Sequence, residues 1–238
     1  MLLRTWRLAV LIVASILVSA VVVLPSGNAV AETRPVVAVV GDSYTAAWGA
    51  IFERTPPTTD GAWWRYTAAS LGWTPGDVVA VPGGGYVRRG GTTGQNFLEA
   101  LRANPLDAGT DYVLLQGGYN DRTYSTSAVR AGVREVLQTI RLQAPQAVVI
   151  VVGAFLPQPS RVTTNFVEVA RIIGSSGSIG QTPYMSAFMC YFTLAADGTH
   201  PDAKGHRDIG RWVARRIMQG MDNAPAFEKD PTGSFYVA

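Results

Sequence analysis

The chain has 238 residues, of which 47% are apolar and 16% are charged. This length corresponds to one domain or at most two. The apolar content excludes an intrinsically disordered chain, which would combine low hydrophobicity with high net charge. A single cysteine, Cys190, excludes an intramolecular disulfide framework and a cysteine-rich zinc site. Because only two histidines accompany that cysteine, we expect no metal centre.

The net charge of +3 does not indicate a nucleic-acid partner. Two of the 20 basic residues, Arg4 and Arg7, lie in the first 31 residues, which contain no acidic residue. The rest of the chain therefore has 18 basic and 17 acidic residues and is close to neutral. No run of five or six basic residues occurs, so we expect no binding to nucleic acid.

The first 31 residues have the layout of a secretory signal peptide. Two arginines form a short positive segment, residues 8–24 are an uncharged apolar run, and Ala29-Val30-Ala31 is a small-residue cleavage pattern. We predict cleavage after Ala31; the alternative is an uncleaved anchor, because about 17 apolar residues nearly suffice to span a bilayer. In either case we expect residues 32–238 to lie outside the cytoplasm, either secreted or in the cell envelope.

The remaining 207 or so residues alternate between two kinds of pattern. Apolar, β-branched runs, typical of strands buried on both faces, cover residues 35–40, 77–81, 112–116, 147–152 and, more weakly, 183–188. Segments with helical spacing cover residues 62–71, 95–103, 127–144, 165–173 and 202–218. This alternation predicts one domain of the α/β class. We expect a three-layer α/β/α sandwich around a mostly parallel, flavodoxin-like sheet of about five strands.

Chemically active side chains follow these predicted strands, where the ligand site of a parallel sheet lies. Ser43 follows the first strand, and we expect it at the start of a helix, where backbone N–H groups favour developing negative charge. A glycine cluster that includes Gly83 follows the second strand, and Asn120 follows the third. Before the last helix, Asp197 precedes His200 by three residues, a spacing that lets a carboxylate orient an imidazole.

Together these residues predict a hydrolytic site. We assign Ser43 as the nucleophile, His200 as the general base and Asp197 as the carboxylate that orients the base. The backbone N–H groups of Ser43 and Gly83, with the side-chain amide of Asn120, are the predicted oxyanion hole.

The same residues make the sequence resemble the SGNH, or GDSL-type, hydrolase family. That family carries a Ser, a Gly, an Asn and a His in four sequence blocks. The matching segments here are residues 41–43, 83–86, 118–121 and 197–201, in order and each after a predicted strand. The second block is the loosest match, because Val81-Pro82 replace the usual Asn or small polar residue. Gly83 is chosen over Gly84 and Gly85 by its spacing from Tyr86, and the choice stays open.

The resemblance implies a serine esterase or lipase that forms an acyl-enzyme and hydrolyses lipid, short-acyl or acetylated-glycan esters. An acyltransferase of the cell envelope could use the same site, because water and an alcohol attack the same intermediate. The other alternative is a non-catalytic module that binds glycan or lipid. The glycine cluster lacks the G-x-G-x-x-G spacing and no Gly-Lys-Ser/Thr occurs, so we expect no cofactor. We expect a monomer.

Other residues near these blocks are candidates either for the pocket or for a structural role. Trp48 and Tyr86 are candidates to line an acyl or sugar pocket, with core packing as the alternative. We expect Asp42 and Asp121 to brace the loop backbones, and His206 to pack inside the last helix.

Overall fold

The computed structural model describes residues 33–47, 61–158, 162–177, 182–188, 190–220, 227–229 and 235–237. By its internal contacts the chain divides after Thr33, and the part from Arg34 to Ala238 is one unit. The predicted signal peptide and Trp48 lie outside the described residues. In the part of the chain that is described, no helix combines the length and the apolar character that crossing a membrane requires.

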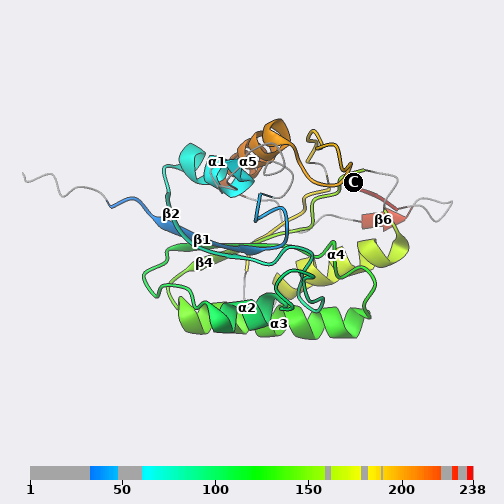
Figure 1. The fold of residues 1–238 in the computed structure, drawn as a ribbon, viewed down its shortest axis with the longest axis horizontal. Helices are drawn as coiled ribbons and strands as arrows, with labels where there is room; N and C mark the ends of the chain where they lie inside the picture. Colours follow the sequence, from blue (N-terminus) through cyan, green and yellow to red (C-terminus); the bar gives the residue numbers. More distant parts are fainter. Residues whose placement is uncertain are drawn as a thin grey trace, which may run out of the picture. The chain divides into compact units, whose positions relative to one another are not determined.

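A parallel sheet of five strands lies at the centre of this unit (Figure 1). Its strands, in the order β2-β1-β3-β4-β5, are β1 (Val36–Gly41), β2 (Thr74–Ala80), β3 (Tyr112–Gln116), β4 (Val148–Val152) and β5 (Tyr184–Met185). Every neighbouring pair in it is parallel. This is the predicted flavodoxin-like order, in which the connections change direction between β1 and β3 and leave a crevice for a ligand.

Helices cover both faces of the sheet, which confirms the predicted three layers (Figure 1). On one face α1 (Trp63–Leu71) packs against α5 (Ala203–Met218). The other face is covered by α2 (Phe97–Ala103), α3 (Thr126–Gln143) and α4 (Thr164–Gly177), and α3 contacts both of its neighbours. Two further short strands, β6 (Phe227–Lys229) and β7 (Phe235–Val237), form an antiparallel pair of their own.

The central strand β1 shows why its sequence is apolar at every position. Successive side chains of a strand point to opposite faces of the sheet. Val37 and Val39 accordingly pack with Trp63 of α1, whereas Ala38 and Val40 pack on the other face with residues of α2 and α3. A strand with helices on both sides has no face left for polar side chains, so its pattern is continuous rather than alternating.

Helix α4 is longer than predicted. The sequence pattern ends it at residue 173, because Gly174 and the serines that follow have low helix propensity, but the helix continues to Gly177. A Cβ atom at Gly174 would lie 3.0 Å from the ring of Tyr184, so a larger residue would crowd the packing between α4 and β5. The close approach of α4 to β5 thus explains why glycine occurs here inside a helix.

Candidate active site

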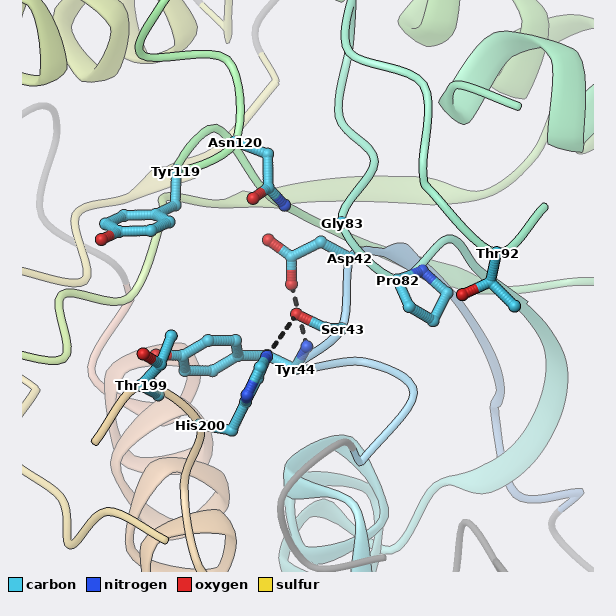
Figure 2. A pocket seen from close by; sticks show the side chains of 10 residues that line it. All are labelled: Asp42, Ser43, Tyr44, Pro82, Gly83, Thr92, Tyr119, Asn120, Thr199 and His200. Carbon is cyan, nitrogen blue, oxygen red and sulfur yellow. Dashed lines mark hydrogen bonds between the residues drawn. The ribbon is translucent and has the colours of Figure 1, made fainter. Parts of the chain in front are cut away.

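The predicted site residues gather at the carboxyl ends of β1, β2 and β3, at the switch point of the sheet. Ser43, Gly83, Asn120 and His200 border a pocket of about 320 Å³ (Figure 2). Figure 2 shows Ser43 and His200 facing one another, with Gly83 and Asn120 on the side of Ser43 away from the imidazole. The other residues that line the pocket are Asp42, Tyr44, Pro82, Thr92, Tyr119 and Thr199.

Ser43, His200 and Asp197 form one chain of hydrogen bonds. His200 Nε2 lies 2.9 Å from Ser43 Oγ, and His200 Nδ1 lies 2.6 Å from Asp197 Oδ2. Partial burial opposes ionisation of Asp197, but hydrogen bonds from His200 and from the Thr199 backbone outweigh it and lower the pKa of this carboxyl. A carboxylate therefore faces the imidazole at neutral pH, which favours a proton on Nδ1 and leaves Nε2 to accept one from Ser43.

The segment that carries His200, residues 195–201, is called the histidine loop. Asp197 Oδ1 accepts hydrogen bonds from the backbone N–H groups of Thr199 and His200, each at 2.9 Å. The N–H of Ala195 donates to the His200 carbonyl at 2.8 Å, which closes the loop. Bonds within the loop thus bring the carboxylate and the imidazole together.

The segment that carries Ser43, residues 41–47, is called the serine loop. Asp42 Oδ1 accepts from the Tyr44 N–H at 2.9 Å, and the Asp42 carbonyl accepts from Thr45 and Ala46 at 3.1 and 3.2 Å. The helix expected to start here is not found among the described residues, in which this segment forms successive turns. Ala47 has a left-handed backbone, with φ of 57°, which a right-handed helix does not allow.

Asp42 braces this loop from the interior, as predicted. Only 2% of its surface is exposed. Burial raises the pKa of Asp42 to about 7, and hydrogen bonds from the Tyr44 N–H and the Gln116 amide act against that rise. The pKa of the carboxyl next to Ser43 therefore lies close to neutral pH, far above the pKa of Asp197.

Among the three glycines at 83–85, the hydrogen bonds favour Gly83 as the oxyanion donor. The N–H of Gly84 donates to Val81 at 2.8 Å and that of Gly85 donates to Arg88 at 2.9 Å. Gly83 borders the pocket, and none of the described residues accepts its N–H. Its φ of 71° is a left-handed conformation that glycine adopts without strain.

The Asn120 amide lies next to Gly83. One of its N–H groups donates to the Gly84 carbonyl at 2.8 Å, which fixes the direction of the side chain and leaves the second N–H to the pocket. Figure 2 shows the amide nitrogen turned toward Gly83.

Asp121 braces the glycine-rich loop, as predicted. Its carboxylate accepts from the N–H groups of Tyr86, Val87 and Arg88 at 2.9 to 3.0 Å. Burial raises the pKa of Asp121, and these three hydrogen bonds oppose that rise. The side chain next to Asn120 is therefore occupied in holding the loop that carries Gly83.

The whole of this arrangement falls within a known family pattern. The family model of GDSL-like lipases and acylhydrolases matches residues 39–207, from β1 into α5. The chain belongs to the GDSL-like lipase/acylhydrolase family. It is therefore a carboxylic ester hydrolase, and the resemblance found in the four sequence blocks is confirmed.

Solved structures share the fold of this GDSL hydrolase at low sequence identity. A carbohydrate acetylesterase from Sinorhizobium meliloti has a TM-score of 0.60 and 18% identity over 79% of this chain and all of its own. A family two carbohydrate esterase from Cellvibrio japonicus has a TM-score of 0.63 and 17% identity over 78% of this chain and 61% of its own. A family two carbohydrate esterase from Clostridium thermocellum, solved with cellohexaose, has a TM-score of 0.60, with 17% identity, over 78% of this chain and 64% of its own. The chain thus spans less than two thirds of the two family two enzymes. A comparison with curated proteins gives no match.

Tyr86 of this GDSL hydrolase does not line the pocket, so the prediction of a pocket role for it is wrong. Its side chain is only 1% exposed and packs edge to face on Phe97, with ring centroids 5.2 Å apart. Because the Tyr86 N–H is bound by the buried Asp121, the loop turns inward at this residue. The other pocket candidate, Trp48, lies outside the described residues.

Two other residues, His206 and Cys190, are buried in the structure. His206 is fully buried in α5, as expected of a packing residue. Cys190 is buried and forms no disulfide.

Sequence reasoning missed several residues that shape the site. Tyr44 Oη donates to the Thr199 carbonyl at 2.6 Å and so joins the serine loop to the histidine loop. Thr92 and Tyr119 border the pocket; Tyr119 lies in the third sequence block beside Asn120, whereas nothing in the sequence around Thr92 points to the site. Gln116 lies beneath the serine loop; its one available signal was that it ends an otherwise apolar strand with a polar side chain.

Proposed function

We propose that this GDSL hydrolase is an exported serine esterase that removes short acyl groups from polar alcohols such as glycans. In this proposal Ser43 is the nucleophile, His200 the general base and Asp197 the orienting carboxylate. The observation that carries the proposal is the 2.9 Å contact of Ser43 Oγ with His200 Nε2, backed by the 2.6 Å contact of His200 with Asp197. A nucleophile, its base and the group that orients the base are thus in hydrogen-bond reach of one another.

In the first step Ser43 Oγ attacks the ester carbonyl carbon while its proton passes to His200 Nε2. The carbonyl oxygen becomes an oxyanion, which accepts hydrogen bonds from the N–H groups of Ser43 and Gly83 and from the Asn120 amide. Each such donor is worth about 3–4 kcal/mol of the barrier. Asp197 stabilises the imidazolium that forms, and His200 then gives the proton to the departing alcohol, which leaves an acyl group on Ser43.

In the second step water takes the place of the alcohol. His200 removes a proton from the water as its oxygen attacks the acyl carbon, and the same donors hold the second oxyanion. The bond between Ser43 Oγ and the acyl carbon then breaks, and His200 returns the proton to Ser43. The products are a carboxylic acid and the free enzyme.

The pocket supports a small acyl group on a polar alcohol. Its volume of about 320 Å³ is near the lower end of the roughly 300–1,000 Å³ usual for small-molecule sites. Of the described residues that line it, Thr92 and Thr199 carry hydroxyl groups and Tyr119 carries an aromatic ring, whereas none is Leu, Ile, Val, Met or Phe. The lining also presents apolar surface, so it is the small volume that argues against a long acyl chain, while the hydroxyl groups can bind those of a sugar. All three of the similar structures described above are named as carbohydrate esterases, which favours the same interpretation.

Export is proposed from residues 1–31 alone. Their positive start, apolar run and Ala29-Val30-Ala31 pattern are those of a cleaved signal peptide. N-terminal sequencing of the protein recovered outside the cell is expected to begin at Glu32. Recovery of the intact chain in a membrane fraction would support the uncleaved anchor instead.

A chain-length profile tests the substrate class. We expect the purified protein to hydrolyse acetyl and propionyl aryl esters faster than octanoyl or longer ones, and to release acetate from acetylated oligosaccharides. A preference for long acyl chains would contradict the proposal and favour a lipase. Transfer of most acyl groups to an added alcohol, rather than to water, would favour the acyltransferase.

Labelling tests the nucleophile. A fluorophosphonate is expected to modify the protein at Ser43, as located by mass spectrometry of the labelled peptide. A folded protein that is neither labelled nor active would favour the non-catalytic binding module.

A further inference from the structure

A buried amide lies directly beneath the serine loop. Gln116 is the last residue of β3, and only 1% of its surface is exposed. Its Oε1 accepts a hydrogen bond from Thr45 Oγ1 at 3.1 Å, and its Nε2 lies 3.4 Å from Asp42 Oδ2. One side chain of the central sheet thus contacts the residues on both sides of the Ser43-Tyr44 pair.

The end of β1 is shaped to admit this network. A Cβ atom at Gly41 would lie 2.2 Å from Thr45 Oγ1 and 2.9 Å from Gln116 Oε1. Glycine at position 41 therefore leaves the room in which the amide meets the hydroxyl group. The Thr45 carbonyl in turn accepts from the Trp64 indole at 3.1 Å, which connects the same residue to α1.

The serine loop needs such a support because it contains no regular element. Ser43 is followed by turns, and Ala47 has a left-handed backbone conformation. The position of Ser43 Oγ relative to His200 Nε2 thus depends on where Asp42 and Thr45 are held. Both are nearly or completely buried, at 2% and 0% exposure, and both are bound by Gln116.

We propose that Gln116 is a positioning residue for the nucleophile: its amide fixes Asp42 and Thr45 and so sets the approach of Ser43 Oγ to His200. This inference rests on the proposed function of Ser43. Gln116 borders neither the pocket lining nor the hydrogen-bond chain of Ser43, His200 and Asp197, so its effect on the reaction is indirect.

Replacement of the amide by an apolar side chain of similar size tests the proposal. Gln116→Leu removes both hydrogen bonds, and we expect it to lower kcat by about 10- to 100-fold, because small displacements of a reacting group cost up to about 100-fold in rate. KM should stay within about threefold, because the pocket lining is unchanged. The rate of fluorophosphonate labelling at Ser43 should fall in parallel with kcat.

The chain offers a matched control in Gln143. Its side chain also makes two hydrogen bonds, accepting from the Leu106 N–H at 3.2 Å and donating to the Leu101 carbonyl at 2.9 Å, but it joins α2 and the following segment to α3. Gln143→Leu is expected to lower the melting temperature without lowering kcat or the labelling rate. If both glutamine variants lowered kcat alike, the effect would be one of general stability and the proposal would be wrong.

Thr45 provides a second test, which applies even if the Gln116→Leu variant does not fold. Thr45→Val keeps the shape and loses the hydroxyl group, and is expected to lower kcat about tenfold, whereas Thr45→Ser keeps the hydroxyl group and should restore kcat to within about twofold. Equal activity of the two Thr45 variants would overturn the proposal.

Ser43→Ala separates this inference from the function on which it rests. If Ser43→Ala stays active, the proposed nucleophile is wrong, whatever the glutamine variants do. If Ser43→Ala is inactive but Gln116→Leu and Thr45→Val keep full kcat, the proposed function stands and only the positioning role of Gln116 fails.

Discussion

The serine loop and the histidine loop present two functional groups to the same pocket but are held in opposite ways. Asp42 and Thr45 of the serine loop are buried, and they bind Gln116, which lies 74 and 71 positions away along the chain. In the histidine loop, side-chain exposure is 36% for Asp197 and 17% for His200, and the bonds that join them span two or three residues.

This difference predicts that substitutions in the two loops affect the reaction rate and the stability of the fold differently. The histidine loop is held mainly by bonds within itself, so we expect a substitution there to remove a proposed catalytic group and to change the rest of the fold little. The serine loop is continuous with the interior of the sheet, so a substitution there should change the rate and the free energy of unfolding together. The predictions that follow test this contrast, with the effects on rate first and the effect on stability and pH last.

The largest effect is expected at the two ends of the 2.9 Å contact. Ser43→Ala and His200→Ala should each lower kcat by at least about 10⁴-fold, because the triad loses most of its rate when one member is removed. Steady-state kinetics on a preparation free of host esterase would measure this. Activity within tenfold of the parent for either variant would refute the assignment.

The second histidine is the control for the first. His206 is fully buried in α5 and lies six positions after His200. His206→Ala should leave kcat within about threefold but lower the free energy of unfolding by about 2 kcal/mol or more, because it empties a buried site. The reverse result, with His206 needed for turnover and His200 dispensable, would overturn the residue assignment in the last family block.

Asp197→Asn is expected to lower kcat about 10³-fold while the protein stays folded. The amide oxygen can still accept from Thr199 and His200, but the imidazolium loses its negative partner. Asp202→Asn is the matched control: Asp202 also lies before α5, also has a lowered pKa, and accepts from the Gly205 N–H as the helix cap. Because Asn is equally good at a helix N-terminus, this control should keep full activity. Equal losses in the two variants would argue that Asp197 only shapes the loop.

Gly83→Ala is expected to lower kcat about tenfold or more by displacing an oxyanion donor. Gly72 is its matched control, because the two glycines have φ of 71° and 70° and neither would bring a Cβ atom within 3.4 Å of a neighbour. Both variants should lose about 1–2 kcal/mol of stability from the left-handed conformation, so the loss of stability cancels in the comparison. A Gly83→Ala enzyme as active as Gly72→Ala would exclude Gly83 as a donor.

The last prediction concerns stability and pH rather than rate. Burial raises the pKa of Asp42 from 3.8 to about 7, so the folded state favours the protonated carboxyl. That contribution is fully present below about pH 4 and is lost as the pH rises through 7. Asn cannot ionise, so the Asp42→Asn variant should not lose this contribution. Between pH 4 and pH 8 its free energy of unfolding should therefore rise relative to that of the parent by up to about 4 kcal/mol.

Denaturant unfolding of both proteins across that pH range measures the difference. Asp197→Asn should show the opposite sign, because the pKa of Asp197 is lowered and its contribution is lost as the pH falls. A difference between Asp42→Asn and the parent that does not change with pH would mean that Asp42 is ionised in the fold throughout.

The layers of the fold and the order of the site blocks could be read from the sequence because their signals are local. Continuous apolar runs such as residues 35–40 predict strands that helices cover on both sides, and the structure has β1 at Val36–Gly41. The spacing of Asp197 and His200 is informative for the same reason: three residues suffice to close the turn that joins them.

Other features depended on contacts between distant segments, and only the tertiary structure decided them. Tyr86 faces the core because Asp121, 35 positions away, binds its N–H. The choice of Gly83 is decided over a shorter range, by a loop path in which the N–H groups of Gly84 and Gly85 donate to the carbonyls of Val81 and Arg88. Gln116 meets Thr45 only because β1 and β3 are adjacent in the sheet. A local pattern specifies which element forms, but a hydrogen bond across the sheet requires that strand order, register and loop path are all in place, and no short stretch of sequence encodes these together.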